Sequence, residues 1–197
     1  MRLRLALALS LTLSLPALAA EPQTGCGDPF TKATLAGFSP AAVVGPRIEA
    51  KPALRIVGRE GVFGANSDAY AIDRLWFEVN RKDNDWIKDR VDEDAFGVCF
   101  GADASGRFHY LAGKEVTGAA APPEETTTML VPARTYAVFT YKGIALGIAD
   151  ARHLIYAELL PNAGLKPLAA PEVESFGAHY WATSPLAVME IWVPVEQ

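Results

Sequence analysis

The sequence contains few of the residues on which catalysis and metal binding most often depend. It has only two cysteines and three histidines in 197 residues. The histidines lack metal-ligand spacing, and the acidic run 83–94 lacks the glycine and the ligand periodicity of a calcium loop. No G-x-S-x-G motif and no glycine-rich phosphate loop occurs. We therefore expect no metal site and no cofactor.

Positive charge and long apolar runs are also scarce. The chain has 18 basic and 23 acidic residues, a net charge of −5, and no basic stripe that would bind a phosphate backbone. The apolar run Leu5 to Leu15 is too short to cross a bilayer comfortably, and no later run is longer. We expect neither nucleic-acid binding nor stable membrane insertion.

The first 19 residues have the pattern of a secretory signal peptide. Arg2 and Arg4 precede the apolar run, and Pro16 precedes a small-x-small cleavage site at residues 17–19. This pattern predicts a periplasmic or secreted protein, with a retained N-terminal anchor as the alternative.

The two cysteines, Cys26 and Cys99, would then lie in a compartment that permits oxidation. A disulfide would close a loop of about 73 residues and stabilise the fold by roughly 4 kcal/mol in the chain-entropy model. It would fix an extended leader, residues 20–45, to a strand. The alternative is that Cys99, between Val98 and Phe100, is a buried thiol.

The rest of the chain has the same order of elements twice. The first half predicts a strand at 53–57, a helix from Ser67 or Asp68, and strands at 96–100 and 107–116. The helix has apolar residues at i, i+3, i+4 and i+7, which are Ile72, Leu75, Trp76 and Val79.

The second half predicts a strand at 127–141, a helix that Pro161 ends, and closing strands at 177–182 and 186–195. The halves correspond at an offset of about 80 residues, so that Tyr110 corresponds to Glu190. We expect an α+β fold, a duplicated βαββ module with pseudo-twofold symmetry. Its helices would cover one face, and a ligand cleft would lie between the halves.

Glu190 lies in the otherwise apolar run AVMEIWVPV, where an ionised carboxylate is costly without a partner. Strand alternation places Trp192 on the same face, and Met189, Ile191 and Val193 on the face packed by helices. Aromatic rings around a carboxylate suit an organic cation. The other predicted walls of this site are Tyr110, Tyr141 and Tyr180, or Trp181 if the register slips by one residue. The alternatives are that the aromatics fill the core and that Glu190 is an edge-strand charge or the partner of a buried Arg.

Several motifs, taken in order, resemble the GyrI-like small-molecule-binding domain of multidrug-sensing regulators. They are LW at 75–76, AFGVCFGAD, FHYLAGKEV, VPARTYAVFTYKG, IYAELLPNAG and MEIWVPV. The resemblance implies one domain over 46–197, with repeats at about 47–118 and 126–197. It also implies that Glu190 is the family's ligand-contacting glutamate and that Glu174 is a second one, near the pocket rim. The chain differs from the family in having Tyr141 in place of a frequent histidine and Leu159 in place of a tryptophan.

These observations favour an exported protein that sequesters or senses a hydrophobic, cationic small molecule. The sequence has a predicted signal peptide, and we recognise no DNA-binding domain in it. For these two reasons we do not expect a transcription regulator. One alternative is a hydrolase of strained electrophiles, with Glu190 as general base and Tyr110 or Tyr141 as donor. The other is an envelope protein-interaction module. An enzyme would turn its substrate over, and a binding protein would be saturated by its ligand without forming product. An interaction module would show neither behaviour. The oligomeric state stays open.

Overall fold

The structure is a computed structural model that describes residues 25–26, 36–64, 67, 70–81, 87–118 and 122–196. The predicted signal peptide and most of the predicted leader lie outside these residues. None of the helices in the described part of the chain is long and apolar enough to cross a membrane.

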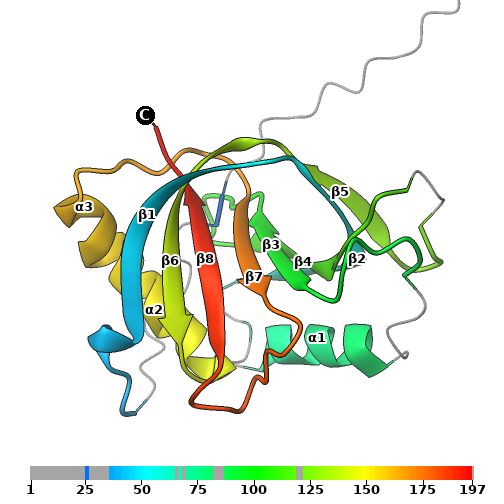
Figure 1. Ribbon diagram of the computed structural model, residues 1–197, viewed down its shortest axis with the longest axis horizontal. Helices are drawn as coiled ribbons and strands as arrows, with labels where there is room; N and C mark the ends of the chain where they lie inside the picture. The colour runs from blue at the N-terminus through cyan, green and yellow to red at the C-terminus, as the bar shows by residue number, and fades with distance from the viewer. Residues whose placement is uncertain are drawn as a thin grey trace, which may run out of the picture.

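All eight strands of the described chain form one antiparallel sheet (Figure 1). The strand order across the sheet is β1-β6-β8-β7-β3-β4-β2-β5. The strands are β1 (Val43–Lys51), β2 (Leu54–Phe63), β3 (Ala95–Phe100), β4 (Phe108–Glu115), β5 (Thr127–Val131), β6 (Arg134–Lys142), β7 (Glu172–Phe176) and β8 (Val188–Pro194).

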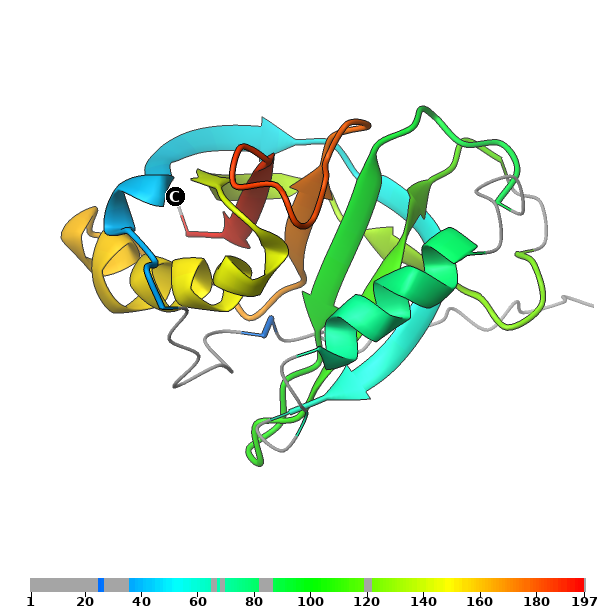
Figure 2. The ribbon, with the colours of Figure 1, turned by 90° about the horizontal axis from the view of Figure 1, so that it is seen from below.

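Two helical segments lie against the same face of this sheet (Figure 2). The first is α1 (Ala71–Arg81), whose predicted apolar stripe packs on β4. The second runs continuously through η3 (Ala145–Gly147), α2 (Ile148–Leu154), the π-helical turn η4 (Ile155–Leu159) and α3 (Leu160–Asn162). A short 3-10 helix, η1 (Pro40–Ala42), precedes β1. The prediction of an α+β fold is confirmed.

The two faces of the sheet have separate cores. Under the helices, Met189, Ile191 and Val193 pack with Ile155 and Leu160, as strand alternation predicted. The opposite face has a core without helical residues, in which β-strand side chains from both halves of the chain are buried. This core includes Ile56, Val98, Leu111, Val138, Val173 and Trp192.

Several strand predictions are wrong. No strand was predicted at 43–51, where β1 lies; this edge strand has no regular apolar alternation and contains Pro46. The strand predicted at 53–57 is longer and forms β2. The single strand predicted at 127–141 is two strands, because Pro132 cannot donate to a sheet hydrogen bond. The strand predicted at 177–182 lies earlier, as β7, and residues 177–182 form turns.

The outermost strands β1 and β5 are exchanged between the two halves of the chain. β1 leads into β2 through only residues 52–53, yet it pairs with β6. In the same way, β5 leads into β6 through residues 132–133 and pairs with β2. Each half of the sheet is therefore completed by a strand that precedes the other half in sequence.

A disulfide joins Cys26 to Cys99 of β3, the pair that the sequence predicted, with the Cα atoms 5.5 Å apart. Both cysteines are buried, and they belong to the core under α1. The alternative of a free buried thiol at Cys99 is therefore excluded in this structure.

Candidate functional site

The structure divides the six predicted ligand-binding residues between the two faces of the sheet. Tyr110, Tyr141 and Glu174 are buried under the helices, and Tyr180 packs against the same core. Glu190 and Trp192 belong to the opposite face. The predicted ring of tyrosines around Glu190 is therefore not formed.

The reason is a one-residue error in the predicted correspondence of the two halves. Tyr110 corresponds to Glu190 at an offset of 80, but the offset between β4 and β8 that preserves the faces differs by one residue, since Tyr110 and Ile191 both pack under helices. A shift of one residue moves a strand side chain to the other face. Trp76 belongs to the predicted apolar stripe of its helix and packs on Tyr110. The prediction of that stripe did not depend on aligning the two halves of the chain.

Glu190 lies in a network of charges on the open face. Its Oε1 accepts a hydrogen bond from Arg47 Nη2 at 2.5 Å, and its Oε2 accepts one from Trp192 Nε1 at 2.8 Å. Lys51 Nζ lies 3.9 Å from Glu190 Oε2 and 4.4 Å from the centre of the Trp192 ring. With Glu49, which binds both Arg47 and Lys51, the network contains two cations and two carboxylates.

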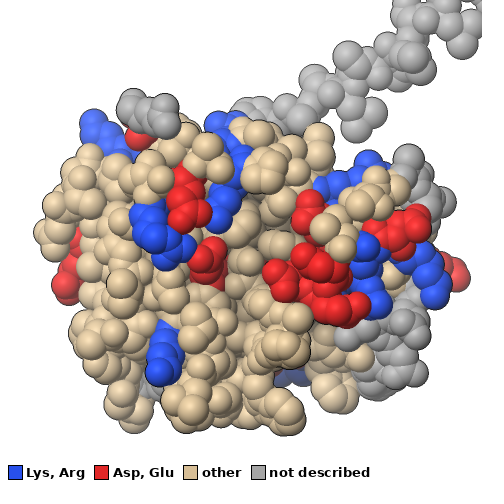
Figure 3. Space-filling view, in the orientation of Figure 1, with Lys and Arg blue, Asp and Glu red and all other residues tan. Residues whose placement is uncertain are grey.

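Figure 3 shows basic and acidic side chains close together over the β1–β8 part of the sheet, where this network lies. The side chain of Glu190 is 31% exposed. The arrangement predicted for a ligand, a cation over the indole and beside the carboxylate, is thus made by the chain's own Lys51.

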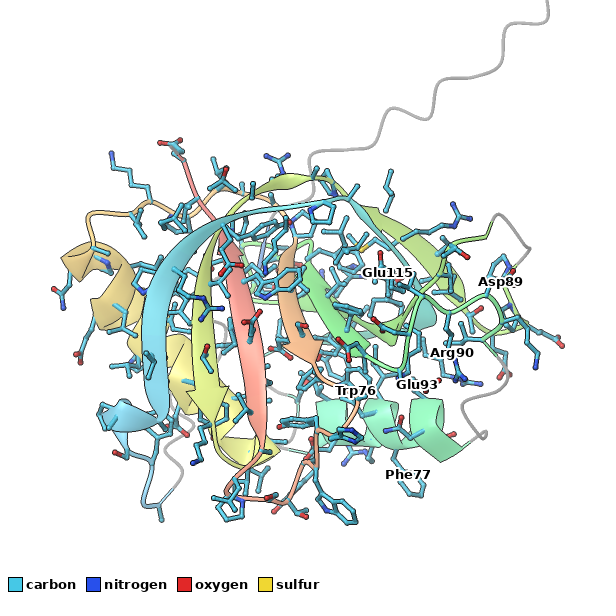
Figure 4. All side chains as sticks on the ribbon, in the orientation of Figure 1. Trp76, Phe77, Asp89, Arg90, Glu93 and Glu115 are labelled. Atoms are coloured by element: carbon cyan, nitrogen blue, oxygen red, sulfur yellow. A yellow bond between two sulfur atoms is a disulfide. The ribbon has the colours of Figure 1, made fainter. Side chains whose placement is uncertain are left out.

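Glu174 has a different environment, at the junction of β7 and β3 under the helices. Its side chain is almost fully buried, and Oε2 accepts a hydrogen bond from the Tyr110 hydroxyl at 2.7 Å. The same hydroxyl accepts a hydrogen bond from Trp76 Nε1 at 3.2 Å. In Figure 4, Trp76 points from α1 toward the sheet, whereas its neighbour Phe77 points away. A relay of hydrogen bonds therefore links α1 to this carboxylate.

Aromatic rings surround this relay. The ring centres of Trp76 and Phe176 are 5.3 Å apart, and those of Phe176 and Tyr180 are 4.8 Å apart. The Tyr180 hydroxyl is buried and has no hydrogen-bond partner among the described residues. Tyr141 is buried in the adjoining core, where its hydroxyl donates to the carbonyl of Ile144 at 2.9 Å.

A second carboxylate and a guanidinium lie beside Glu174. Arg152 of α2 is 1% exposed and is hydrogen-bonded to Glu172 Oε2, and its Nη1 lies 3.6 Å from Glu174 Oε1. Burial alone would lower the pKa of Arg152, but the carboxylates of Glu172 and Glu174 outweigh burial and raise it. The guanidinium is thus held charged between two acids. We call Glu172, Glu174 and Arg152 the buried triad.

Burial raises the pKa of Glu174 above its usual range, and the nearby charge of Glu172 adds to this shift, whereas Arg152 and Tyr110 oppose it. Burial, followed by the charge of Glu174, also raises the pKa values of Tyr110 and Tyr180. Both tyrosines therefore stay neutral donors at physiological pH. Sequence reasoning missed Trp76, Phe176, Arg152 and Glu172 as members of this cluster, because each one alone looks like an ordinary core or surface residue.

An open hollow of about 370 Å³ lies elsewhere, in the loop 87–93. Its lining includes Asp89, Arg90 and Glu93, which are labelled in Figure 4, and Arg90 and Glu93 form an ion pair of 3.1 Å. It contains no aromatic side chain and none of the residues of the two clusters described above. We do not assign it a function.

The fold is shared with several solved structures. The solved structures that resemble it include SAV2435 bound to tetraphenylphosphonium, with a TM-score of 0.62 and 16% identity over 77% of this chain and 93% of that one. They also include the integron cassette protein VCH_CASS2 of Vibrio cholerae, with a TM-score of 0.59 and 15% identity over 78% and 97% of the two chains.

Residues 47–195 match the family model of Cass2, the integron-associated effector-binding protein, and the chain belongs to this family. The resemblance to the GyrI-like domain is thereby confirmed. The transcriptional regulator BrlR of Pseudomonas aeruginosa is 33% identical over 150 residues, which are 76% of this chain. The chain matches only 54% of the length of that relative.

Proposed function

We propose that this protein sequesters or senses a hydrophobic organic cation, which it binds under the helices beside Glu174. The observation that carries the proposal is an almost fully buried carboxylate that is hydrogen-bonded to Tyr110, the first of a series of contacting aromatic rings that continues through Trp76 and Phe176 to Tyr180. Aromatic faces supply apolar area and cation–π attraction, and the carboxylate neutralises the positive charge.

The charge balance of the buried triad supports a cation over an anion. Its two carboxylates face one guanidinium. If both acids are ionised, one negative charge has no partner within the triad, which is costly at a buried position. The raised pKa of Glu174 reflects this cost. A bound cation would supply the missing charge.

Two comparisons support a small-molecule ligand. The family is described as effector-binding, and SAV2435, which has the same fold, is bound to tetraphenylphosphonium, a lipophilic cation. At 16% identity this structure shows the fold alone, so the ligand class rests on the residues around Glu174.

Binding requires space that the packed cluster does not leave, and Tyr180 is the residue we expect to move. It lies in the turns that join β7 to β8, outside both strands, and its buried hydroxyl has no hydrogen-bond partner among the described residues. We propose that the ligand displaces the Tyr180 ring and takes its place against Phe176.

Glu190 and Trp192 form the second candidate site, on the open face. The contact of Lys51 with the Trp192 ring supports the choice of this position, because the Lys51 ammonium lies there beside Glu190. A ligand would have to displace Lys51 and Arg47 from a balanced ion network, and we therefore place Glu174 first.

We also infer that the fold is a duplication with a pseudo-twofold axis between β7 and β3. In this duplication β6, β8 and β7 correspond to β2, β4 and β3. The order β6-β8-β7 on one side of the axis is then repeated in reverse, as β3-β4-β2, on the other side. β2 and β6 begin about 80 residues apart, and so do β4 and β8. The Glu174 cluster would then lie on the axis, where the two halves meet.

Export is a further part of the proposal. It is supported by the signal-peptide pattern of residues 1–19 and by the disulfide, because disulfides persist mainly in oxidising compartments. The N-terminal sequence of the protein recovered from the periplasm or the medium tests it: a start at Ala20 supports export, and an intact Met1 in the cytoplasm contradicts it.

The binding proposal is tested by titrating tetraphenylphosphonium into the wild-type protein and the variants Glu174→Gln and Glu190→Gln. We expect Glu174→Gln to weaken binding at least tenfold, about 1.4 kcal/mol, and Glu190→Gln to change it less than twofold. The reverse result would move the site to the open face. No binding by the wild-type protein would reject the proposal, and chemically altered electrophiles recovered after incubation would favour the hydrolase alternative.

A further inference from the structure

The disulfide holds a short piece of N-terminal backbone against the buried triad. We call Gly25 and Cys26 the strap. Cys26 is 5% exposed and is bonded to Cys99 of β3, and its backbone N–H donates to Glu172 Oε1 at 2.9 Å. The strap therefore contacts a charged member of the proposed ligand site from a position 146 residues away in the sequence.

The approach of the strap to Glu172 requires a glycine. A Cβ atom on Gly25 would lie 2.5 Å from Glu172 Oε1 and 2.7 Å from the carbonyl oxygen of Ala170. The second atom belongs to the backbone and cannot move aside easily. Only a residue without a side chain lets the strap lie this close to the carboxylate.

The two oxygens of Glu172 have different partners. Oε1 accepts the backbone N–H of Cys26, and Oε2 accepts the guanidinium of Arg152. Arg152 makes only the longer contact of 3.6 Å with Glu174. The strap thus fixes Glu172 in the orientation that gives Arg152 its shorter contact, and Glu174 has the longer one.

We propose that the strap determines the charge specificity of the ligand site. This rests on the proposed binding of a cation beside Glu174. With the strap in place, Arg152 is shared between the two acids with its shorter contact to Glu172, and the charge of Glu174 is only partly neutralised. Without the strap, Glu172 loses its backbone donor and turns toward water, and Arg152 closes on Glu174 and neutralises it. The disulfide then has a role in ligand selection besides its role in stability.

The experiment compares two probes, tetraphenylphosphonium and the uncharged triphenylphosphine oxide, on oxidised protein. The ratio of their affinities measures the preference for a cation, which a merely less stable fold does not change. We expect the double variant Cys26→Ser/Cys99→Ser to reduce this preference about tenfold. Glu172→Gln should do the same, because it also frees Arg152 to pair with Glu174. The matched control is Glu124→Gln, which removes an exposed carboxylate and should leave the preference unchanged.

Combining the variants tests whether the strap acts through Glu172. If it does, the triple variant Cys26→Ser/Cys99→Ser/Glu172→Gln should lose no more of the cation preference than either parent variant. The reason is that the effects of coupled residues are not additive. A full cation preference in the double cysteine variant, or a triple variant whose loss is the product of the separate losses, would overturn the proposal.

If the double cysteine variant does not fold, Gly25→Ala replaces it in this test, because it keeps both cysteines. It should displace the strap and reduce the cation preference, and an unchanged preference in folded Gly25→Ala protein also counts against the strap. Failure of the wild-type protein to bind tetraphenylphosphonium is a different outcome, since it would reject the proposed function itself.

Discussion

Tyr110 donates its phenolic hydrogen to Glu174 across β3, over a sequence distance of 64 residues. The donor belongs to β4 in the first half of the chain and the acceptor to β7 in the second half. The bond passes over Gly97 of β3, where a Cβ atom would collide with the Tyr110 hydroxyl. The candidate site is thus built jointly by both halves and depends on a missing side chain between them.

Binding of a cation beside Glu174 should depend on pH. Burial raises the pKa of this carboxyl in the free protein, and a bound cation favours the ionised form, so that binding releases a proton. Affinity for tetraphenylphosphonium should therefore rise with pH and level off above the raised pKa of the free protein. The folded state also holds this proton more tightly than the unfolded state, and the contribution of Glu174 to stability is lost over the same rise in pH. Titrations from pH 5 to pH 8 measure the effect, and a pH dependence that persists in Glu174→Gln would assign it to another group.

Gly97→Ala should disturb the site and the fold together. The new methyl group would force the buried Tyr110 ring off Glu174, and overpacking of this kind costs about 1–3 kcal/mol. Chemical denaturation measures the loss. Gly177→Ala is the matched control, because a Cβ atom there would meet nothing within 4 Å. Equal stability of the two variants would show that Tyr110 can move without cost.

Tyr180→Phe should stabilise the free protein and weaken the complex. The hydroxyl is buried without a hydrogen-bond partner among the described residues, and removing such a group should recover about 1 kcal/mol. If a ligand or released water uses this hydroxyl as a partner, affinity falls at the same time. Denaturation and titration of the same variant measure both effects, and a loss of stability would indicate that the hydroxyl is satisfied.

Reduction of the Cys26–Cys99 disulfide should lower the stability of the fold by about 4 kcal/mol, as the entropy of a loop of about 73 residues predicts. Urea denaturation with and without a thiol reductant measures it. The comparison protein is Cys26→Ser/Cys99→Ser, which should be insensitive to the reductant. If the reduced wild-type protein is as stable as the oxidised one, the disulfide does not stabilise the fold by constraining the unfolded chain.

Periodicity predicted the helices and most strands, because the apolar positions of α1 and β8 repeat at the spacing of the structure they form. It failed at β1, an edge strand whose residues alternate irregularly between exposed and buried. It also failed between β7 and β8, where aromatic residues in turns resemble a strand. A pattern of residue types indicates that one face of an element is buried, but it does not indicate which other segment packs on that face.

The choice between Glu190 and Glu174 could not be made from local sequence. Glu190 was notable because its neighbours are apolar, but its partners Arg47 and Lys51 come from β1, more than a hundred residues earlier. Glu174, in PEVESF, looks like one of several surface acids, and only the placement of β7 in the centre of the sheet buries it. The family resemblance named both residues, and the structure distinguishes their environments.

The exchange of β1 and β5 means that the molecule cannot be divided into two self-sufficient pieces. If the chain is cut in the link between β4 and β5, the first piece carries β1 but lacks the β6 edge on which it lies, and its β2 loses β5. The second piece has the reciprocal defect, and each fragment would expose a bare strand edge to its surroundings. If the fold arose by the duplication that we infer, a single-module ancestor would have been complete only as a dimer that exchanged its outer strands. Fusion into one polypeptide would have made that exchange permanent.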